Sequence, residues 1–467
     1  MAVTSDRADS NLTTVGTVPA PRAGRWVDQY DPEDTVQWQA TGRRAAKRNL
    51  ALSIFAEFLG FSVWQLWTIV TPSLNKAGFA LTADQVFWLI AIPNLVGATL
   101  RFPYTFAVPR FGGRNWTIVS ALLLVVPCVG LAVVVQNPQT PFWLMVLVAA
   151  TAGVGGGNFA SSMANISFFF PEREKGAALG LNAAGGNLGV AVVQLAIPII
   201  VVIGGGLALQ RAGLVIVPLA VLAAVLAWRY MDNLSTAKAD LAGYAAAMRN
   251  KHTWIVSFLY IGTFGSFIGY AGVFPTLINT QFPQAVFDWG FVGLPQVPLT
   301  LAFLGALVGS MARPSGGRIA DRLSGANVSI AAYLVMALGA LGVILSLAAG
   351  SFAGFFACFL LLFVASGVGN GAVYRMIPAI FRAGIDPTDT GAMVLAKRKA
   401  AACIGLAAGI GAYGGFIIPR VFAWSISSTG TLRPALIGFI GFYAVCAVVT
   451  TVVYKLGRER RFAGTSI

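Results

Sequence analysis

Long apolar runs separated by short polar segments constrain the fold of this chain more than any other feature of its sequence. From Asn49 onward there are twelve such runs, at about residues 49–75, 86–109, 115–136, 142–170, 176–204, 212–231, 253–276, 295–320, 327–349, 353–381, 396–422 and 433–455. About 20 apolar residues allow a helix to span roughly 30 Å of hydrocarbon. Only 10% of the residues are charged, whereas a soluble domain has about 25%. The sequence therefore predicts an all-α membrane protein with twelve transmembrane helices.

The basic residues are distributed unevenly over the segments that connect these spans. The net charge is +15, and Lys and Arg together number 32. With both termini inside the cell, the tails and cytoplasmic loops hold 25 of them, the spans hold three, and the outer loops hold four, namely Lys76, Arg211, Arg420 and Arg433. This is the positive-inside pattern. We expect a multi-pass protein of the inner cell membrane with both termini cytoplasmic, and the basic excess requires no nucleic acid.

The spans form two sets of six on either side of a polar segment. The first 48 residues are polar and lack a signal-peptide core, which favours a cytoplasmic tail. We therefore predict five parts: a cytoplasmic N-terminal tail (1–48), an N-terminal six-helix half (49–231), a central cytoplasmic loop (232–252), a C-terminal six-helix half (253–455) and a cytoplasmic C-terminal tail (456–467).

A weak internal repeat relates the two halves. Gly153-Val-Gly-Gly-Gly157 in the fourth span matches Gly367-Val-Gly-Asn-Gly371 in the tenth at an offset of 214 residues. The segments after the second and eighth spans match at an offset of 212, which aligns Arg101 with Arg313 inside the membrane. Repeats of this kind are typical of secondary transporters. The expected fold is thus two pseudo-symmetric six-helix halves.

The two aligned arginines carry the most distinctive chemistry in the spans. An arginine near the bilayer centre costs about 2.5–3.5 kcal/mol on insertion scales. Only Glu57 is a deep carboxylate, so Arg101, Arg313 and Arg375 leave an excess of positive charge that favours a small anion. A guanidinium group suits planar oxyanions such as carboxylate, nitrate or nitrite. In the alternative interpretation, each arginine bonds helix carbonyls or reaches toward the membrane surface.

Residue types that would support catalysis or metal binding are scarce. The single histidine, His252, opens the seventh span, and the four cysteines lie inside apolar spans, where we expect packed thiols rather than disulfides: Cys128, Cys358, Cys403 and Cys446. We expect no cofactor, no metal site and no enzyme activity, because a nucleophile–base pair is lacking. An anion channel would need a continuous polar pore, whereas a paired site suits alternating access.

Several motifs resemble those of one transporter family. Gly316-Gly-Arg-Ile-Ala-Asp-Arg-Leu-Ser-Gly325 looks like the cytoplasmic signature loop of the major facilitator superfamily. The string that begins at Gly153 and the glycines after Gly180 closely resemble the nitrate signature of the nitrate/nitrite porter family. So do the motif ending at Gly371, the stretch ending at Gly269 and the Asp-Pro-Glu-Asp34 of the tail. The resemblance covers essentially the whole chain. It implies the fold of the major facilitator superfamily and transport of nitrate or nitrite.

The resemblance also implies a set of substrate-binding residues. These are two clamping arginines, two aromatic rings that enclose a flat anion, one hydroxyl donor and one polar residue of the first signature: Arg101, Arg313, Phe159, Phe264, Tyr260 and Asn187. Two aromatic walls would exclude water and so strengthen the contacts of the arginines.

The sequence departs from the exchanger branch of that family in its charged residues. Glu57 lies in the first span, Arg375 interrupts the tenth, and Lys397-Arg-Lys399 opens the eleventh. Glu57 and Arg375 are candidates for proton coupling, although Glu57 could instead form a structural ion pair. Importing one anion into a negative-inside cell costs about 2.3 kcal/mol per 100 mV. We therefore expect proton-coupled nitrate import, with electroneutral nitrate/nitrite antiport as the alternative.

Overall fold

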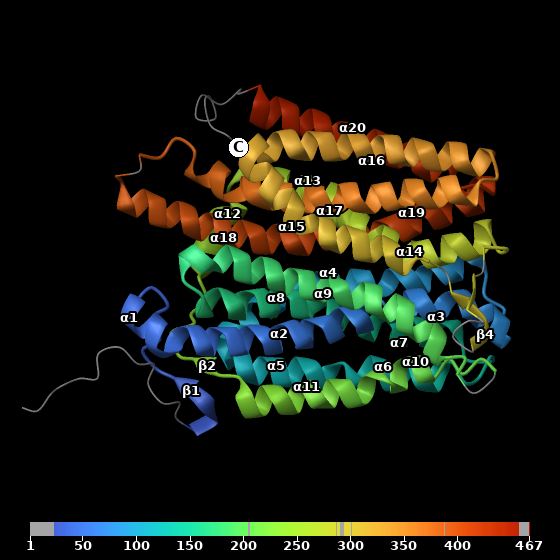
Figure 1. The fold of residues 1–467 in the computed structure, drawn as a ribbon, viewed down its shortest axis with the longest axis horizontal. Helices are drawn as coiled ribbons and strands as arrows, with labels where there is room; N and C mark the ends of the chain where they lie inside the picture. Colours follow the sequence, from blue (N-terminus) through green and yellow to red (C-terminus); the bar gives the residue numbers. More distant parts are fainter. Residues whose placement is uncertain are drawn as a thin grey trace, which may run out of the picture.

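The chain forms two blocks of helices that lie side by side (Figure 1). The computed structural model describes residues 23–203, 206–285, 287–289, 294–299, 301–386, 388–456 and 467. In Figure 1 the N-terminal block runs from blue to green and the C-terminal block from yellow to red. The described tail residues of both termini lie at the same end of the bundle. We refer to this end, which also carries the segment between the halves, as the tail end.

Six helical stretches make up the N-terminal half. Several are interrupted by single residues or by short 3-10 or π turns, and their bounds are η1 (Ala23–Arg25), α1 (Thr35–Gln37), η2 (Trp38–Gly42), α2 (Arg43–Trp64), α3 (Leu66–Leu74), η3 (Asn75–Ala77), α4 (Ala83–Phe111), α5 (Gly113–Leu123), α6 (Val125–Val134), α7 (Phe142–Thr151), α8 (Gly153–Phe169), α9 (Glu172–Ile200), α10 (Arg211–Leu214) and α11 (Ile216–Tyr230). The polar segment that follows contains the short helix α12 (Leu241–Met248).

The C-terminal half repeats this plan. Its bounds are α13 (Lys251–Tyr260), the π turn η4 (Ile261–Gly265), α14 (Ser266–Gln281), α15 (Phe303–Leu323), α16 (Gly325–Ala348), α17 (Phe352–Arg382), α18 (Thr390–Ala412), α19 (Gly414–Thr429), α20 (Arg433–Thr450) and η6 (Thr451–Lys455). The two halves meet where α4 packs on α18 and α19, α9 on α15, and α3 on α14.

The predicted all-α membrane architecture is confirmed. Eleven helical stretches of the described residues are long and apolar enough to cross a membrane. The twelfth helix of the expected plan is α15, which has 21 residues, packs along α17 and carries Arg313, Arg318, Asp321 and Arg322. These charges lower its mean hydropathy.

The expected start of the eighth span at residue 295 is wrong. Residues Leu294–Leu299 form strand β4, and the helix begins only at Phe303. Pro295 and Pro298 explain the difference, because proline lacks the backbone N–H that continues a helix. Strand β4 pairs antiparallel with β3 (Phe287–Trp289) at the end of the bundle opposite the tails.

At the tail end, the N-terminal segment is joined to the segment between the halves. Strand β1 (Trp26–Val27) pairs in parallel with β2 (Asn233–Leu234). Asp34 caps α1 by accepting hydrogen bonds from the backbone N–H groups of Val36 and Gln37. The described part of the N-terminal tail is therefore a folded element of this end.

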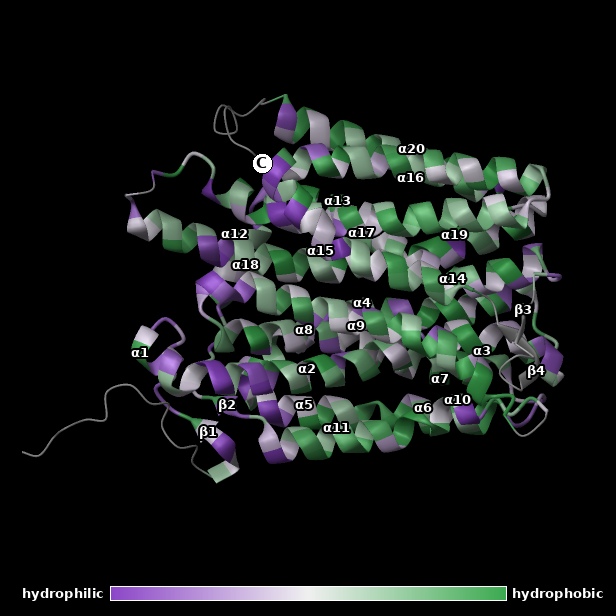
Figure 2. Cartoon of the chain, viewed as in Figure 1, coloured by the Kyte–Doolittle hydropathy of each residue, from purple (hydrophilic) through white to green (hydrophobic). Residues whose placement is uncertain are grey.

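Apolar side chains cover both the interior and the outer faces of the bundle. Figure 2 shows green along the helices and purple gathered mainly at the two ends. Large apolar side chains such as Val133, Leu338 and Val448 are exposed on outer faces, as expected where helices meet lipid rather than water. All four cysteines are free, which agrees with the expected packed thiols.

The glycine motifs pack in the same way in both halves. A Cβ on Gly153 would lie 2.8 Å from the backbone nitrogen of Gly97, and a Cβ on Gly367 would lie 2.2 Å from the carbonyl oxygen of Gly309. Only glycine allows helices to approach so closely. Gly97 and Gly309 are also 212 residues apart, so the packing agrees with the internal repeat.

Candidate functional site

Arg101 is on α4 and is deeply buried, with only 1% of its surface exposed. Its Nε donates to the carbonyl oxygen of Gly156 at 3.1 Å, and its Nη1 donates to that of Ala408 at 2.8 Å. Gly156 belongs to the N-terminal half and Ala408 to the C-terminal half. The guanidinium group therefore lies at the boundary between the halves, and its Nη2 has no hydrogen-bond partner among the described residues.

Four aromatic rings surround this guanidinium group. Its carbon Cζ lies 4.6 Å from the ring centre of Phe159 and 5.1 Å from that of Phe264. Trp64 and Phe61 follow at 5.2 and 5.9 Å. The two rings expected from the sequence, Phe159 and Phe264, thus come from opposite halves and reach the same arginine. Rings at these distances attract a cation and keep water away from it.

Arg313 lies in the C-terminal half, on α15, and is also buried. Its Nη2 donates to the hydroxyl of Tyr260 at 3.2 Å, and its Cζ lies 5.1 Å from the ring centre of Tyr374. Tyr260 stacks on Tyr374 with ring centres 4.6 Å apart, and on Phe264 with ring centres 5.3 Å apart. The stacked rings join the surroundings of Arg313 to those of Arg101, and Nη1 of Arg313 lacks a partner among the described residues.

Glu57 lies in the first span, on α2, and is as deeply buried as Arg101. Its Oε2 accepts a hydrogen bond from Nδ2 of Asn182 at 2.6 Å. Both Arg101 and Arg313 interact with it electrostatically, but none of the ion pairs within 4 Å among the described residues includes Glu57. This geometry favours a carboxyl group near the arginines over the alternative of a closed structural ion pair.

Asn187 is buried on α9 at the edge of this cluster. It follows Gly186, where a Cβ would come within 2.6 Å of Oε1 of Glu57. Its Oδ1 has no hydrogen-bond partner among the described residues, and neither have Oε1 of Glu57 and Oδ1 of Asn370. Buried polar atoms normally have partners. These three atoms lie on α2, α9 and α17, and they make the region around the arginines a candidate polar binding site.

Arg375 does not join the cluster. It is about half exposed and forms an ion pair with Asp321 on α15. The residue before it, Tyr374, faces Arg313 instead. Neighbouring residues on a helix point about 100° apart, because 3.6 residues make one turn. The structure therefore does not bring Arg375 together with Glu57, the other residue expected to take part in proton coupling.

The basic run at the start of the eleventh span also lies outside the site. Lys397, Arg398 and Lys399 are on α18, and Arg398 forms a hydrogen-bonded ion pair with Asp240. The hydrogen bond from Arg398 keeps the pKa of Asp240 below its usual value. This pair ties the segment between the halves to α18.

Four neighbours of the arginines or of Glu57 are absent from the expected set: Phe61, Trp64, Asn182 and Tyr374. Glu57, Phe61 and Trp64 are spaced four and three residues apart, so they share one helix face. This spacing in the sequence could have indicated that Phe61 and Trp64 lie near Glu57. Asn182 and Tyr374 carry no comparable signal, because their partners are on other helices.

The chain matches known proteins over nearly all of its length. The profile described as Major Facilitator Superfamily matches residues 50–419. "Nitrate/nitrite transporter NarU" of Escherichia coli (strain K12) is 39% identical, with 92% of this chain and 96% of that protein covered. "Probable nitrate/nitrite antiporter NarK2" of Thermus thermophilus is 38% identical, with 90% and 94% covered.

The fold is also similar to that of solved transporters. The partially occluded, inward-open xylose transporter XylE of E. coli superposes with a TM-score of 0.63 at 13% identity, with 88% of this chain and 99% of that chain covered. An inward-facing bacterial homologue of the lysosomal transporter Spinster gives 0.62 at 13% identity, with 90% and 98% covered. These structures support the fold alone. From the profile and the full-length relatives, the chain belongs to the nitrate/nitrite transporter family of the major facilitator superfamily.

Proposed function

We propose that this multi-pass membrane protein transports nitrate, nitrite or both by alternating access to one central anion site. The observation that carries the proposal is the pair of buried guanidinium groups, one from each half, each with an N–H group that lacks a partner among the described residues. An anion between them would accept those hydrogen bonds and contact both halves at once. Motion of one half against the other would then expose the site to one side at a time.

The shape of the site favours a flat, small anion. A guanidinium group donates two parallel hydrogen bonds to a planar oxyanion. The rings of Phe159 and Phe264 lie against Arg101 from opposite halves and supply apolar walls on which such an ion could stack. The relatives at 38–40% identity are named for nitrate and nitrite. Both ions are planar and singly charged, in agreement with this chemistry.

We propose that nitrate import is coupled to protons through Glu57. An anion that binds near Arg101 and Arg313 would compete with this carboxyl group for the positive field of the two arginines. Anion and proton would then promote each other's binding, by reciprocal linkage. One proton per nitrate would cancel the charge moved and offset the cost of about 2.3 kcal/mol per 100 mV.

Electroneutral nitrate/nitrite antiport is the second candidate function. The relative of T. thermophilus, which is 38% identical over most of both chains, bears the name of an antiporter. An exchanger requires no titratable group in its site, so Glu57 would then only position Asn182. A channel is disfavoured, because it needs a continuous polar pore, whereas Arg101 donates hydrogen bonds to carbonyl groups of both halves at their boundary.

The membrane placement is part of the same proposal. The tail end carries the described residues of both tails and the basic segments, so we assign it to the cytoplasm of a cell with an inner membrane. We include in this proposal the five parts expected from the sequence, with the halves at 49–231 and 253–455.

Counterflow in proteoliposomes tests the transport mode. With the membrane potential clamped at zero, vesicles loaded with unlabelled nitrate should take up labelled nitrate in any carrier, whereas a channel would give no transient accumulation. With empty vesicles, an inward pH gradient should drive accumulation only if protons are coupled. Accumulation that needs internal nitrite and ignores the pH gradient would favour antiport instead.

A further inference from the structure

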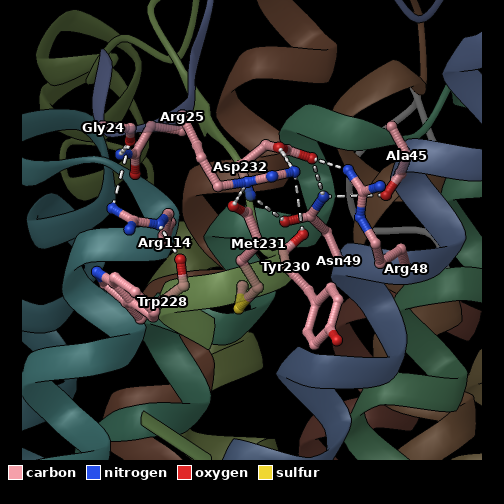
Figure 3. Close-up of polar contacts among 11 residues, drawn as sticks. Gly24, Arg25, Ala45, Arg48, Asn49, Arg114, Trp228, Tyr230, Met231 and Asp232 are labelled. Carbon is pink, nitrogen blue, oxygen red and sulfur yellow. Dashed lines mark hydrogen bonds and ion pairs between the residues drawn. The ribbon is translucent and has the colours of Figure 1, made fainter. Parts of the chain in front are cut away.

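A second basic site lies at the tail end, far from the central arginines in the fold. A pocket of about 740 Å³ opens between the start of α5, the end of α11 and the N-terminal segment at Gly24 and Arg25. Three arginines line it: Arg25, Arg114 and Arg229. Figure 3 shows Arg25, Arg114 and Trp228 around this junction. Neither the expected transport site nor the nitrate signature includes any of these residues.

Arg114 forms the floor of the pocket and is held by neutral groups. Only 8% of its surface is exposed. Its Nε donates to the carbonyl oxygen of Trp228 at 2.9 Å, and its Nη1 donates to Oδ1 of Asn115 at 3.0 Å and to the carbonyl oxygen of Gly24 at 3.3 Å. No carboxylate pairs with it among the described residues. The buried guanidinium charge is thus fixed in place without being neutralised.

The carboxylate nearest to this pocket is shared. Asp232 pairs with Arg25 at 2.6 Å and also with Arg48, and it accepts a further hydrogen bond from Asn49 (Figure 3). Arg229 is exposed and forms no ion pair with a described residue; its guanidinium lies 5.2 Å from the ring centre of Tyr230. One carboxylate therefore faces several arginines, and the pocket is strongly positive.

One wall of the pocket faces the membrane. Ile118 and Val119 on α5 and Trp228 on α11 line it, and the side chain of Trp228 is 59% exposed. Tryptophan is enriched at the level of lipid headgroups. The positive groups therefore lie at the end of a transmembrane helix pair, directly beside apolar side chains that continue along the lipid-facing surface.

We propose that this pocket binds the phosphate headgroup of an anionic phospholipid in the leaflet at the tail end. The phosphate would lie among Arg25, Arg114 and Arg229, and an acyl chain would follow Ile118 and Val119. Basic pockets between transmembrane helices suit such headgroups. A free phosphate ion would make no favourable contact with the apolar wall, whereas an acyl chain would. We therefore assign the site to a lipid.

The bound lipid would join three elements. Arg114 already links α5 to α11 through Trp228 and to the N-terminal segment through Gly24. A phosphate group held by these arginines would strengthen that link by relieving their mutual repulsion. The site would therefore fasten the N-terminal segment to the membrane face of the first half.

Native mass spectrometry of the full chain with added phosphatidylglycerol tests the proposal. The variant Arg229→Gln removes an exposed arginine that has no hydrogen bond to a described residue, so it should fold normally. We expect it to weaken the tightest lipid binding about fivefold, the contribution of one arginine near a membrane surface. The matched control is Arg322→Gln, which removes an exposed arginine at the tail end of the other half and should leave binding unchanged.

Three outcomes would overturn the proposal. Equal weakening by both variants would indicate general attraction of charge. Equal retention of phosphatidylcholine would show that the headgroup charge is not recognised. Displacement of the lipid by millimolar inorganic phosphate would assign the pocket to the free ion.

Discussion

Each half of the molecule holds one buried arginine, but the titratable side chains near these arginines differ between the halves. In the N-terminal half, a Cβ on Gly155 would lie 2.1 Å from the carbonyl oxygen of Gly60. In the C-terminal half, a Cβ on Gly369 would lie 2.6 Å from Cγ2 of Thr263. Gly155 and Gly369 are matched by the internal repeat, so Gly60 and Thr263 hold equivalent positions.

Three residues before each of these positions lies a titratable side chain. It is Glu57 before Gly60 and Tyr260 before Thr263. The carboxyl group interacts with Arg101 and Arg313 only through space, whereas the phenol accepts a hydrogen bond from Arg313. The repeat thus supplies one buried arginine in each half, whereas the deep carboxyl group belongs to the first half only. We infer that anion binding is a shared property of both halves and that coupling belongs to the first.

Replacing the arginines by lysine should have the largest effect. Arg101→Lys and Arg313→Lys keep the charge but lose the planar fork, which is not a conservative change at a bidentate site. Loss of one hydrogen bond to a charged group is worth about 1.5–3 kcal/mol. We expect nitrate affinity to fall on the order of tenfold to a hundredfold in each variant, and uptake to be nearly abolished, with normal membrane expression. Labelled-nitrate uptake and binding to purified protein measure this.

The comparison between the halves depends on both arginines. If one lysine variant transported like the wild type, anion binding would belong to a single half. If both variants took up nitrate like the wild type, the hypothesis that the two arginines clamp the anion would be wrong.

Glu57→Gln and Tyr260→Phe should separate coupling from binding. The glutamine mimics the protonated carboxyl group, so this variant should retain nitrate counterflow but lose accumulation driven by an inward pH gradient. Tyr260→Phe removes the hydroxyl that accepts from Arg313, so it should weaken nitrate binding several-fold, since one hydrogen bond contributes about 0.5–1.5 kcal/mol, while coupling remains. Both variants are measured in the same proteoliposomes.

If Glu57→Gln still accumulated nitrate in response to an inward pH gradient, proton coupling could not be assigned to Glu57 in the first half. Glu57 would then be structural, and antiport would become the better description. A coupling defect in Tyr260→Phe would assign proton linkage to both halves.

Removing the aromatic rings should have a moderate effect. Phe159→Ala and Phe264→Ala each delete one ring that lies against Arg101. Cation–π contacts contribute about 0.5–2 kcal/mol, so we expect nitrate to bind about threefold to tenfold more weakly. Chlorate, which is not flat, should compete better than it does with the wild type.

The matched control for the rings lies outside the site. Phe258→Ala removes a ring that packs edge-on against Phe442 and should leave the competition profile unchanged. If the competition profiles of Phe159→Ala and Phe264→Ala were also unchanged, both rings would contribute only to packing.

Arg375→Gln should have the smallest effect. Its ion pair with Asp321 is about half exposed, and exposed pairs contribute roughly 0–1 kcal/mol. We expect nitrate transport and its pH dependence to change by about twofold or less. A loss of proton-driven uptake in this variant would return Arg375 to the coupling site and extend coupling to the second half.

Much of the architecture was predictable because lipid imposes a simple requirement. A helix that crosses hydrocarbon must be long and apolar, so the spans appear in the sequence as runs. The start of the eighth span was predicted wrongly. The residues before Phe303 are apolar, but they contain Pro295 and Pro298. Most of the expected binding residues also came together, since the glycine motifs and the matched arginines are local signals.

The sequence by itself determined the two arginines, the single deep carboxylate and the repeat that places one arginine in each half. Only the tertiary structure decided which neighbours complete the site. Tyr374 faces Arg313 while Arg375 turns away to Asp321, and Asn182 reaches Glu57 from another helix. Residue spacing defines a helix face, but the rotation of that helix is set by its packing against its neighbours.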